Sequence, residues 1–457
     1  MHTLLAMMIA LVGGTSTPQE VCEQPSDCQD GVCISGTCRM GSASSAVETL
    51  YPLAVPPPVV LGSEARHQKL ADRFVEQLRR DLAWSGFYSM LSVERMPFSY
   101  RVEGASPSEA RRLLWQQAGA FRVLRVVVRP GDDQGSIRIL VRLIEVESFE
   151  WIDLAPGELR VQPGQERALA AACANRIVEL DTGIPGVAGS RIATTIQTSP
   201  GIKEVGLVGG DGEGLTMITA NKSLNLDPAW DGQGRIGYMS YRTGNADWIV
   251  DGTPFSSRPG MNAAGAWSRD GRYLALSVTE GANSDIVIVD GTSGTEQVRV
   301  TEHPGVDTSP TWSPDGKKLA FVSDRSGSPQ VWIVTLATGD LKRLTHSGYN
   351  VAPDWSPNGH SLLYGQLIGS KFVIKRHDFD VPRTLTLTGS AASAENPSFS
   401  ADGRYIVFSR RGADRRASLW VMYADGTHQR ALTSNALPMF SPAWHRRAPT
   451  LKEAPKL

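Results

Sequence analysis

One repeated segment fills more than half of this chain and constrains its fold more than any other feature. The copy at residues 309–334 reads SPTWSPDGKKLAFVSDRSGSPQVWIV, and related segments return at intervals of 37 to 45 residues. A period in the low forties with β-forming residues predicts the blades of a β-propeller, each a four-stranded sheet that must stack on its neighbours. The signature aromatic residues of the six copies are Trp230, Trp267, Trp312, Trp355, Phe399 and Trp444.

The order of residues within one copy predicts four strands. Pro314, Asp315 and Gly316 form a hairpin turn, because proline presets φ, aspartate bonds the local backbone and glycine adopts a left-handed conformation. The apolar run LAFVS that follows suits a strand buried on both faces. Trp312 and Phe321 are expected to pack between blades, at about 1.5 to 3 kcal/mol for each fully buried large side chain.

The sixth copy is incomplete and predicts how the ring closes. Trp444 is followed by His445 and a polar tail instead of a turn and further strands. The missing strands fit residues 191–220, which have no aromatic signature in front of them. One strand from the end of the chain and three from the start of the array would close a six-bladed ring and remove its exposed edges.

The beginning of the chain has the pattern of an exported protein. Residues 4–12 are apolar, too few to span a bilayer, and small residues follow them, so residues 1–17 are expected to be a secretory signal peptide. Residues 18–46 then form a cysteine-rich segment and linker. Its cysteines predict two disulfides with three possible pairings, and zinc binding is the alternative. These cysteines are Cys22, Cys28, Cys33 and Cys38.

Mixed helix and strand patterns predict a compact α/β domain over residues 47–182. Helices are expected from about 64 to 85, from 106 to 117 and from 165 to 180, with a β-hairpin between the second and third. The fifth cysteine, Cys173, falls in step with the apolar residues of the third helix and is expected to be an inert core thiol. The propeller is assigned to residues 190–446 and a polar tail to residues 447–457.

This arrangement resembles the TolB family, the periplasmic component of the Tol-Pal system. The resemblance rests on DLAWSGFY after the first helix, on the joint LDTGIPGVAGSRIATT and on the propeller repeats, and it covers roughly residues 49–446. It implies a non-enzymatic periplasmic adaptor involved in cell-envelope integrity and division. Its propeller would bind the lipoprotein Pal, and its N-terminus would engage the inner-membrane protein TolA.

The resemblance also implies where the partner binds. The mouth of the propeller channel corresponds to the loops in front of the six signatures, where the loops of all blades meet at one end of the channel. The positions carried over are Leu226, Asn262, Thr308, Asn350, Glu395 and Met439.

Other functional readings are weaker in this sequence. Lys and Arg number 46 against 47 Asp and Glu, a balance that gives no general attraction to nucleic acid or to anionic lipid, so contact with a membrane is expected only through partners. Gly232, Gly234 and Gly237 satisfy GxGxxG, but a strand follows where a dinucleotide fold needs a helix. We therefore expect a monomer without metal or cofactor. The alternatives are a propeller enzyme with its active site in the channel, and another exported binding scaffold.

Overall fold

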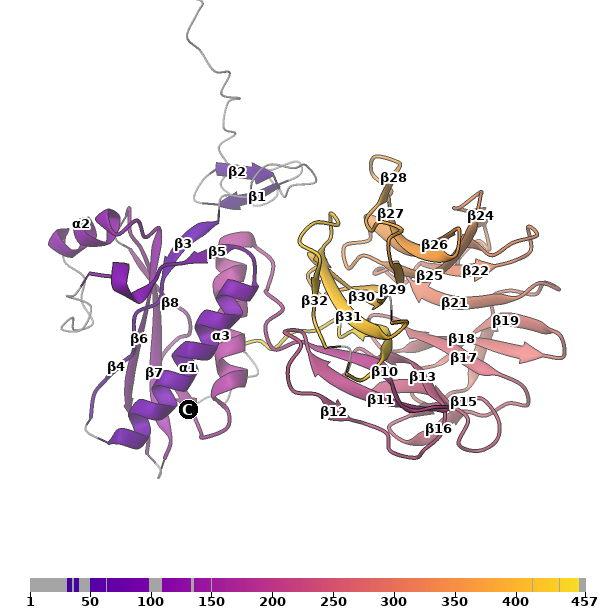
Figure 1. Cartoon of the computed structure of the whole chain (residues 1–457), viewed down its shortest axis with the longest axis horizontal. Helices are drawn as coiled ribbons and strands as arrows, with labels where there is room; N and C mark the ends of the chain where they lie inside the picture. The colour runs from indigo at the N-terminus through magenta and orange to yellow at the C-terminus, as the bar shows by residue number, and fades with distance from the viewer. Residues whose placement is uncertain are drawn as a thin grey trace, which may run out of the picture.

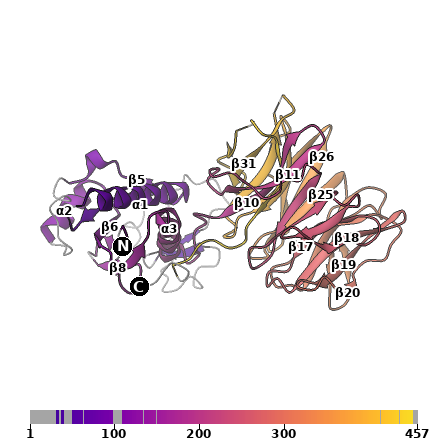
Figure 2. The same cartoon turned by 90° about the horizontal axis from the view of Figure 1, so that it is seen from below.

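The computed structural model describes residues 31–34, 37–40, 50–62, 64–97, 109–132, 135–148, 150–412, 414–434 and 436–451. It contains an α/β domain beside a six-bladed β-propeller, which confirms the predicted fold class (Figure 1). Seen from below, the two domains lie next to each other, and the polypeptide passes between them twice, after α3 and again near the end of the chain (Figure 2). Of the predicted disulfide cysteines, Cys22 and Cys28 lie outside the described residues.

The N-terminal domain is a sheet packed against two long helices. Its strand order is β5-β3-β6-β7-β8, and β4 pairs with β6 while β9 pairs with β7. Before it lies a separate hairpin whose backbone pairs Cys33 with Cys38. The elements are β1 (Gly31–Ile34), β2 (Thr37–Met40), β3 (Tyr51–Ala54), β4 (Val59–Val60), α1 (Ala65–Trp84), β5 (Tyr88–Met90), η2 (Val93–Arg95), α2 (Glu109–Gln117), β6 (Arg122–Pro130), β7 (Ile137–Glu145), β8 (Trp151–Asp153), β9 (Leu159–Val161) and α3 (Glu166–Thr182).

The helices form where apolar residues recur at helical spacing. Leu70, Phe74, Leu78 and Leu82 lie on one buried face of α1 and contact the core that α3 and the sheet share. Cys173 is free and fully buried in the same core, and burial raises the pKa of its thiol to about 12. The thiol is therefore an apolar core group, as the sequence predicted.

Each propeller blade is a four-stranded antiparallel sheet, and the innermost strands of neighbouring blades contact one another around the axis. Blade 1 contains β10 (Arg191–Ser199), β11 (Ile202–Gly209), β12 (Thr216–Met217) and β33 (Met439–Trp444). Blade 2 contains β13 (Asn225–Trp230), β14 (Ile236–Ser240), β15 (Asp247–Val250) and β16 (Thr253–Ser256). Blade 3 contains β17 (Asn262–Trp267), β18 (Tyr273–Glu280), β19 (Asn283–Asp290) and β20 (Glu296–Arg299).

The remaining three blades repeat this order. Blade 4 contains β21 (Asp307–Trp312), β22 (Lys318–Ser323), β23 (Gln330–Thr335) and β24 (Leu341–Arg343). Blade 5 contains β25 (Tyr349–Trp355), β26 (Ser361–Ile368), β27 (Lys371–Asp378) and β28 (Arg383–Thr386). Blade 6 contains β29 (Ser393–Phe399), β30 (Tyr405–Arg411), β31 (Ala417–Tyr423) and β32 (Arg430–Ala431).

The ring closes as the incomplete sixth copy predicted. Blade 1 has the strand order β12-β11-β10-β33, so its innermost strand comes from the end of the chain. Ile192 faces Trp444 in this pairing, and the Trp444 indole Nε1 donates to Ser190 Oγ at 2.9 Å. Three strands from the start of the array therefore hold one strand from its end.

Every innermost strand bends at the same place. Three residues before each signature aromatic, the backbone has a positive φ between 45° and 52°, and the strand register shifts there. None of these residues is glycine, although the left-handed region costs an L-residue roughly 1 to 2 kcal/mol. The sixfold repeat indicates a bulge that the surrounding ring imposes. The residues are Asp227, Ala264, Ser309, Ala352, Asn396 and Ser441.

We expect Ala352→Gly to stabilise the propeller by about 0.5 to 1 kcal/mol, because glycine adopts φ of +50° without a steric penalty. Ala352→Val should destabilise it, because a β-branched side chain resists a positive φ. Urea denaturation of the two variants beside the parent protein measures both changes. Equal stability of the three proteins would contradict a strained bulge.

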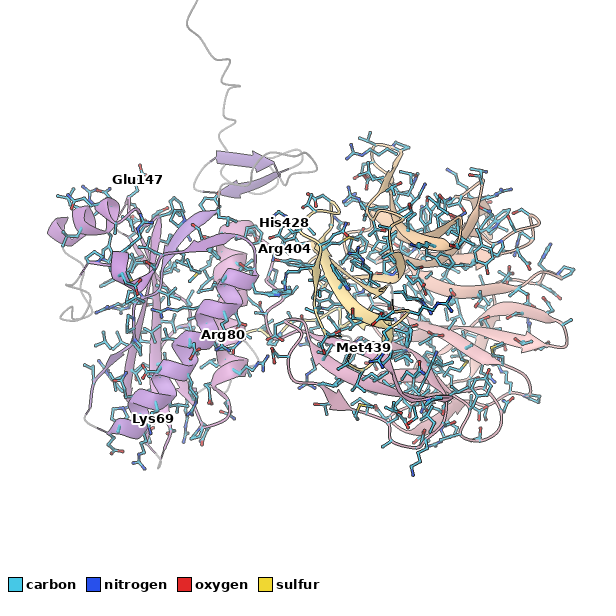
Figure 3. All side chains as sticks on the ribbon, in the orientation of Figure 1. Lys69, Arg80, Glu147, Arg404, His428 and Met439 are labelled. Atoms are coloured by element: carbon cyan, nitrogen blue, oxygen red, sulfur yellow. The ribbon has the colours of Figure 1, made fainter. Side chains whose placement is uncertain are left out.

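Aromatic residues join the two domains. Trp84 at the end of α1 stacks on Tyr405, with ring centroids 4.8 Å apart, and Trp444 lies 6.3 Å from the same tyrosine. The Tyr405 hydroxyl donates to the Ser85 carbonyl at 2.6 Å. A Cβ on Gly86 would lie 2.4 Å from the Tyr423 hydroxyl, so the residue after α1 must stay small. Figure 3 labels Arg404 on the propeller edge that faces α1.

A second connection comes from the end of the chain. Asn175 on α3 donates to the carbonyl of Pro449, and Leu451 packs against the core of the N-terminal domain. The segment after Trp444 therefore returns to the first domain, so the described part of the predicted polar tail lies against that domain.

A buried carboxylate lies at this domain interface. Asp81 on α1 is 6% exposed; its Oδ1 accepts a hydrogen bond from Gln77, while Oδ2 has no partner among the described residues. The pKa of Asp81 is raised from 3.8 to about 6, mainly by burial and in smaller part by Asp211, against lowering by the hydrogen bond from Gln77 and by the charges of Arg167 and Arg80. The charged form is therefore held in an unfavourable place.

The stability of the protein should fall as pH rises from about 4 to about 6, because in that range the folded state alone keeps the Asp81 proton. Above pH 6 the full penalty of about 3 kcal/mol remains. We expect Asp81→Asn to raise the free energy of unfolding at pH 7.5 and to change it little at pH 4. Denaturation of both proteins at the two pH values tests this, and an equal effect at both would contradict it.

Candidate functional site

The two ends of the propeller differ, and the difference locates the candidate site. At one end, here called the turn end, lie the signature aromatic residues and the turns that follow them. At the other end, here called the mouth, the innermost strands begin, for example at Asn225, Asp307 and Ser393. The second strand of each blade ends at the mouth, since Ser393 pairs with Arg411 and Asp307 with Ser323.

At the turn end, side chains and turns of different blades contact one another near the propeller axis. Arg446 reaches from the blade 1 strand to the carboxylate of Asp354 in blade 5, and Arg269 of blade 3 donates to the Pro357 carbonyl at 3.3 Å. Neighbouring turns touch, because a Cβ on Gly232 would lie 2.7 Å from the carbonyl oxygen of Arg269. Burial raises the pKa of Asp354, and Arg446 opposes that rise. Because side chains and turns occupy the turn end, we take the mouth as the opening of the channel that a partner could reach.

The carboxylates of the turns serve the turns themselves. Asp315 Oδ1 accepts from Ser313 Oγ at 2.6 Å and from the backbone of Lys317 at 3.1 Å, and these bonds lower its pKa. Asp270 and Asp402 make the same pair of bonds in their blades. Such a carboxylate holds the hairpin in its turn conformation.

At the mouth, four of the six blades have a buried polar residue five positions before the signature aromatic, and these four residues are here called the polar ring. Asn350 donates to Gln330 Oε1 at 2.9 Å and to the Ser347 carbonyl, and it accepts from Gln366. Arg325 pairs with the equivalent Asp307 at 2.7 Å. Asn350 and Asp307 are 0% exposed, so their hydrogen bonds join the innermost strand to neighbouring segments. The ring consists of Asn225, Asn262, Asp307 and Asn350.

The six expected mouth residues therefore divide into two groups. Asn262 and Asn350 are fully buried and Met439 is 4% exposed, inside the propeller in Figure 3. Leu226, Thr308 and Glu395 are partly exposed, one position further along their strands. Both positions come before the bulge, and successive side chains of a strand face opposite sides, so the residue five positions before the signature is buried and the next one is partly exposed.

Sequence reasoning missed a rim of exposed apolar side chains at the mouth. Met261 and Val306 directly precede innermost strands, and each is more than 40% exposed. Tyr349 begins β25, and its ring lies 6.2 Å from that of Phe372. Large apolar side chains at the ends of strands were the available signal, since a turn does not need them. The rim consists of Tyr241, Met261, Val306, Tyr349, Ile368 and Leu437, with exposed fractions of 38% to 45%.

Ionisable groups at the mouth are mostly paired. Arg299 binds Asp285 at 3.0 Å and Glu280 at 2.6 Å, and Arg258 binds Glu296 at 3.0 Å. Within the described ranges, no three His, Cys, Asp or Glu residues gather as a metal site would require. Over the same ranges, no helix is both long and apolar enough to cross a membrane.

We expect Asn350→Ala to lower the free energy of unfolding by about 1 to 3 kcal/mol, because the buried Gln330 would lose one of its hydrogen-bond partners and the Ser347 carbonyl would lose a donor. Thr308→Ala is the control at the same end, and surface changes of this kind usually stay within about 0.5 kcal/mol. Urea denaturation compares the two variants. Equal effects would contradict a structural role for Asn350.

Comparisons with known proteins agree with this architecture. Residues 178–448 match a family model described as the TolB beta propeller domain. The chain is similar to the Tol-Pal system protein TolB of Desulfosudis oleivorans, at 32% identity over 260 residues, 55% of this chain and 57% of that protein. The TolB protein of Anaeromyxobacter dehalogenans strain 2CP-C is 31% identical over 225 residues, 48% of this chain and 50% of the relative. These matches span about half the length of each relative.

A solved structure covers more of the chain. The crystal structure of TolB from Acinetobacter baumannii has a TM-score of 0.73 and 25% sequence identity, and the match covers 86% of this chain and 96% of that one. The similarity therefore extends over both domains and their order.

Proposed function

The chain belongs to the TolB family, and we propose that it is a non-enzymatic periplasmic adaptor of a Tol-Pal system. In this proposal its propeller mouth binds a Pal-like lipoprotein of the outer membrane, and its N-terminal segment engages a TolA-like protein of the inner membrane. The cysteine-rich segment, of which residues 31–34 and 37–40 are described, would then lie on the TolA side. The role would be to link the two membranes in envelope integrity and division.

The observation that supports binding at the mouth is its rim of exposed apolar side chains. Monomeric proteins seldom leave several large apolar side chains together at one opening unless a partner covers them. Met261, Val306 and Tyr349 come from three successive blades, so a convex partner could contact all three at once. The polar ring beneath them fixes the strands that carry the rim, so little order would be lost on binding.

The pairing of charges also supports an adaptor in preference to an enzyme. Among the expected mouth positions Glu395 is the one ionisable residue, and its carboxylate lies 3.2 Å from Arg411. A general acid or base needs a carboxylate placed to exchange a proton with a substrate. Glu395 is instead held by an arginine and by Ser393 Oγ, which donates to it at 2.8 Å.

Purified protein should bind the soluble domain of the Pal-like lipoprotein from the same organism, measured by titration calorimetry. We expect Met261→Lys with Val306→Lys to weaken binding about tenfold or more, because two desolvated apolar contacts would become charged. Val381→Lys is the matched control, since Val381 is 68% exposed on the loop after β27, at the turn end. Unchanged binding by the double variant would remove the mouth as the binding site.

A further inference from the structure

A basic hairpin stands at one side of the mouth, and neither the fold nor the adaptor role explains its charge. It lies where β30 turns into β31 and contains Arg410, Arg411, Arg415 and Arg416 together with one carboxylate, Asp414, which accepts a hydrogen bond from the backbone of Arg416. Because Arg411 pairs with Ser393 at the start of β29, the hairpin lies at the mouth and not at the turn end. Arg415 has a φ of +59°, which places it in the tight part of the turn.

The arginines of this hairpin have fewer carboxylate partners than Arg299 and Arg325 on blades 3 and 4. Arg325 and Arg299, on blades 4 and 3, each have a carboxylate within 3.0 Å. In the described part of the chain, Arg410, Arg415 and Arg416 have no carboxylate within ion-pair distance, and Arg415 and Arg416 are exposed. The chain as a whole carries a net charge of −1, so this excess of positive charge is local.

An aromatic ring lies beside these cations. Phe440, four positions before Trp444, has Lys203 Nζ 4.9 Å from its ring centroid on one side and the Arg411 guanidinium 5.7 Å away. Arg410 stacks over Trp420 at 4.2 Å. The rings hold the cations in place by their apolar faces and leave donor groups for an incoming anion.

The pair between Arg411 and Glu395 is poised to open. Its two hydrogen bonds are 3.2 Å and 3.4 Å long, and the arginine side chain is 46% exposed. An exposed pair of this kind contributes about 0 to 1 kcal/mol, so an external carboxylate could replace Glu395 at small cost. Glu395 would then act as an internal competitor for the arginine.

We propose that the basic hairpin, with Lys203 and Phe440, binds an acidic segment of a protein partner whose apolar residues enter the mouth. The inference rests on the proposed function, because it concerns the partner of the same opening. Arg411 and Lys203 both lie near the ring of Phe440, and the rim of apolar side chains is at the same end of the propeller. A peptide can present carboxylates and apolar side chains together, so it fits this surface better than a lipid surface does. Alternating carboxylates and apolar side chains would satisfy both features at once.

The probe for the test is a fluorescein-labelled peptide in which Glu and Asp surround a central Phe. A second peptide has Gln and Asn at the acidic positions. Fluorescence anisotropy with the full chain should show binding of the acidic peptide that weakens with added salt, and no comparable binding of the neutral one. Equal binding of both peptides would overturn the proposal.

Charge variants give opposite expectations. Arg415→Glu with Arg416→Glu should weaken acidic-peptide binding about tenfold, whereas Glu395→Gln should strengthen it about twofold by freeing Arg411. Lys317→Glu with Lys318→Glu, the same charge change on exposed residues at the turn end, should have no effect. A hairpin variant that binds like the parent, or a Glu395→Gln variant that binds more weakly, would overturn the proposal.

Two further outcomes separate this inference from the proposed function. If the hairpin variant keeps the Pal-like lipoprotein while Met261→Lys with Val306→Lys loses it, the adaptor function stands and the acidic-segment inference fails. The opposite result is that the hairpin variant loses the acidic peptide while neither the hairpin variant nor the Met261→Lys, Val306→Lys variant changes binding of the lipoprotein. In that case the adaptor function fails. Binding to phosphatidylglycerol vesicles without binding to the peptide would also overturn the inference.

Discussion

The pairing of β33 with β10 is the interaction on which the rest of the structure depends. No blade can bury both faces of its own sheet, so the six sheets are stable only when the ring is closed. Closure joins Trp444 to Ile192, across almost the whole length of the propeller sequence. The entropy of closing so long a loop rises only slowly with its length, so one well-packed strand is enough to hold the ring.

Closure of the ring and docking of the N-terminal domain share residues. Trp444 is 2% exposed, bonds to Ser190 at the start of the propeller and lies close to Tyr405, which itself stacks on Trp84 of α1. The chain then continues to Pro449 and Leu451 on the first domain. A disturbance of the last strand would therefore reach the domain interface as well as blade 1.

The repeat gives the propeller two different ends. At the turn end, short turns pack against one another and Arg446 bonds across to Asp354, so the polypeptide itself occupies that end. At the mouth, a buried amide or carboxylate under each of four blades fixes the strands and leaves the residues above free to contact a partner. Apolar side chains occupy the rim, while four arginines gather between β30 and β31 of blade 6. The mouth is thus asymmetric although the blades are alike.

The sequence alone determined the six blades, the incomplete copy that closes the ring, the mixed domain before it and the inert core position of Cys173. These follow from local patterns, namely the spacing of aromatic residues, turn chemistry and apolar periodicity. Only the tertiary structure decided which mouth residues face outward. Asn350 lies five residues before its signature aromatic and Glu395 lies four before its own, and the structure shows that the first bonds to Gln330 in the interior while the second faces Arg411. Local alternation places adjacent side chains on opposite faces of a strand, but which face is buried depends on how the blades pack around the ring.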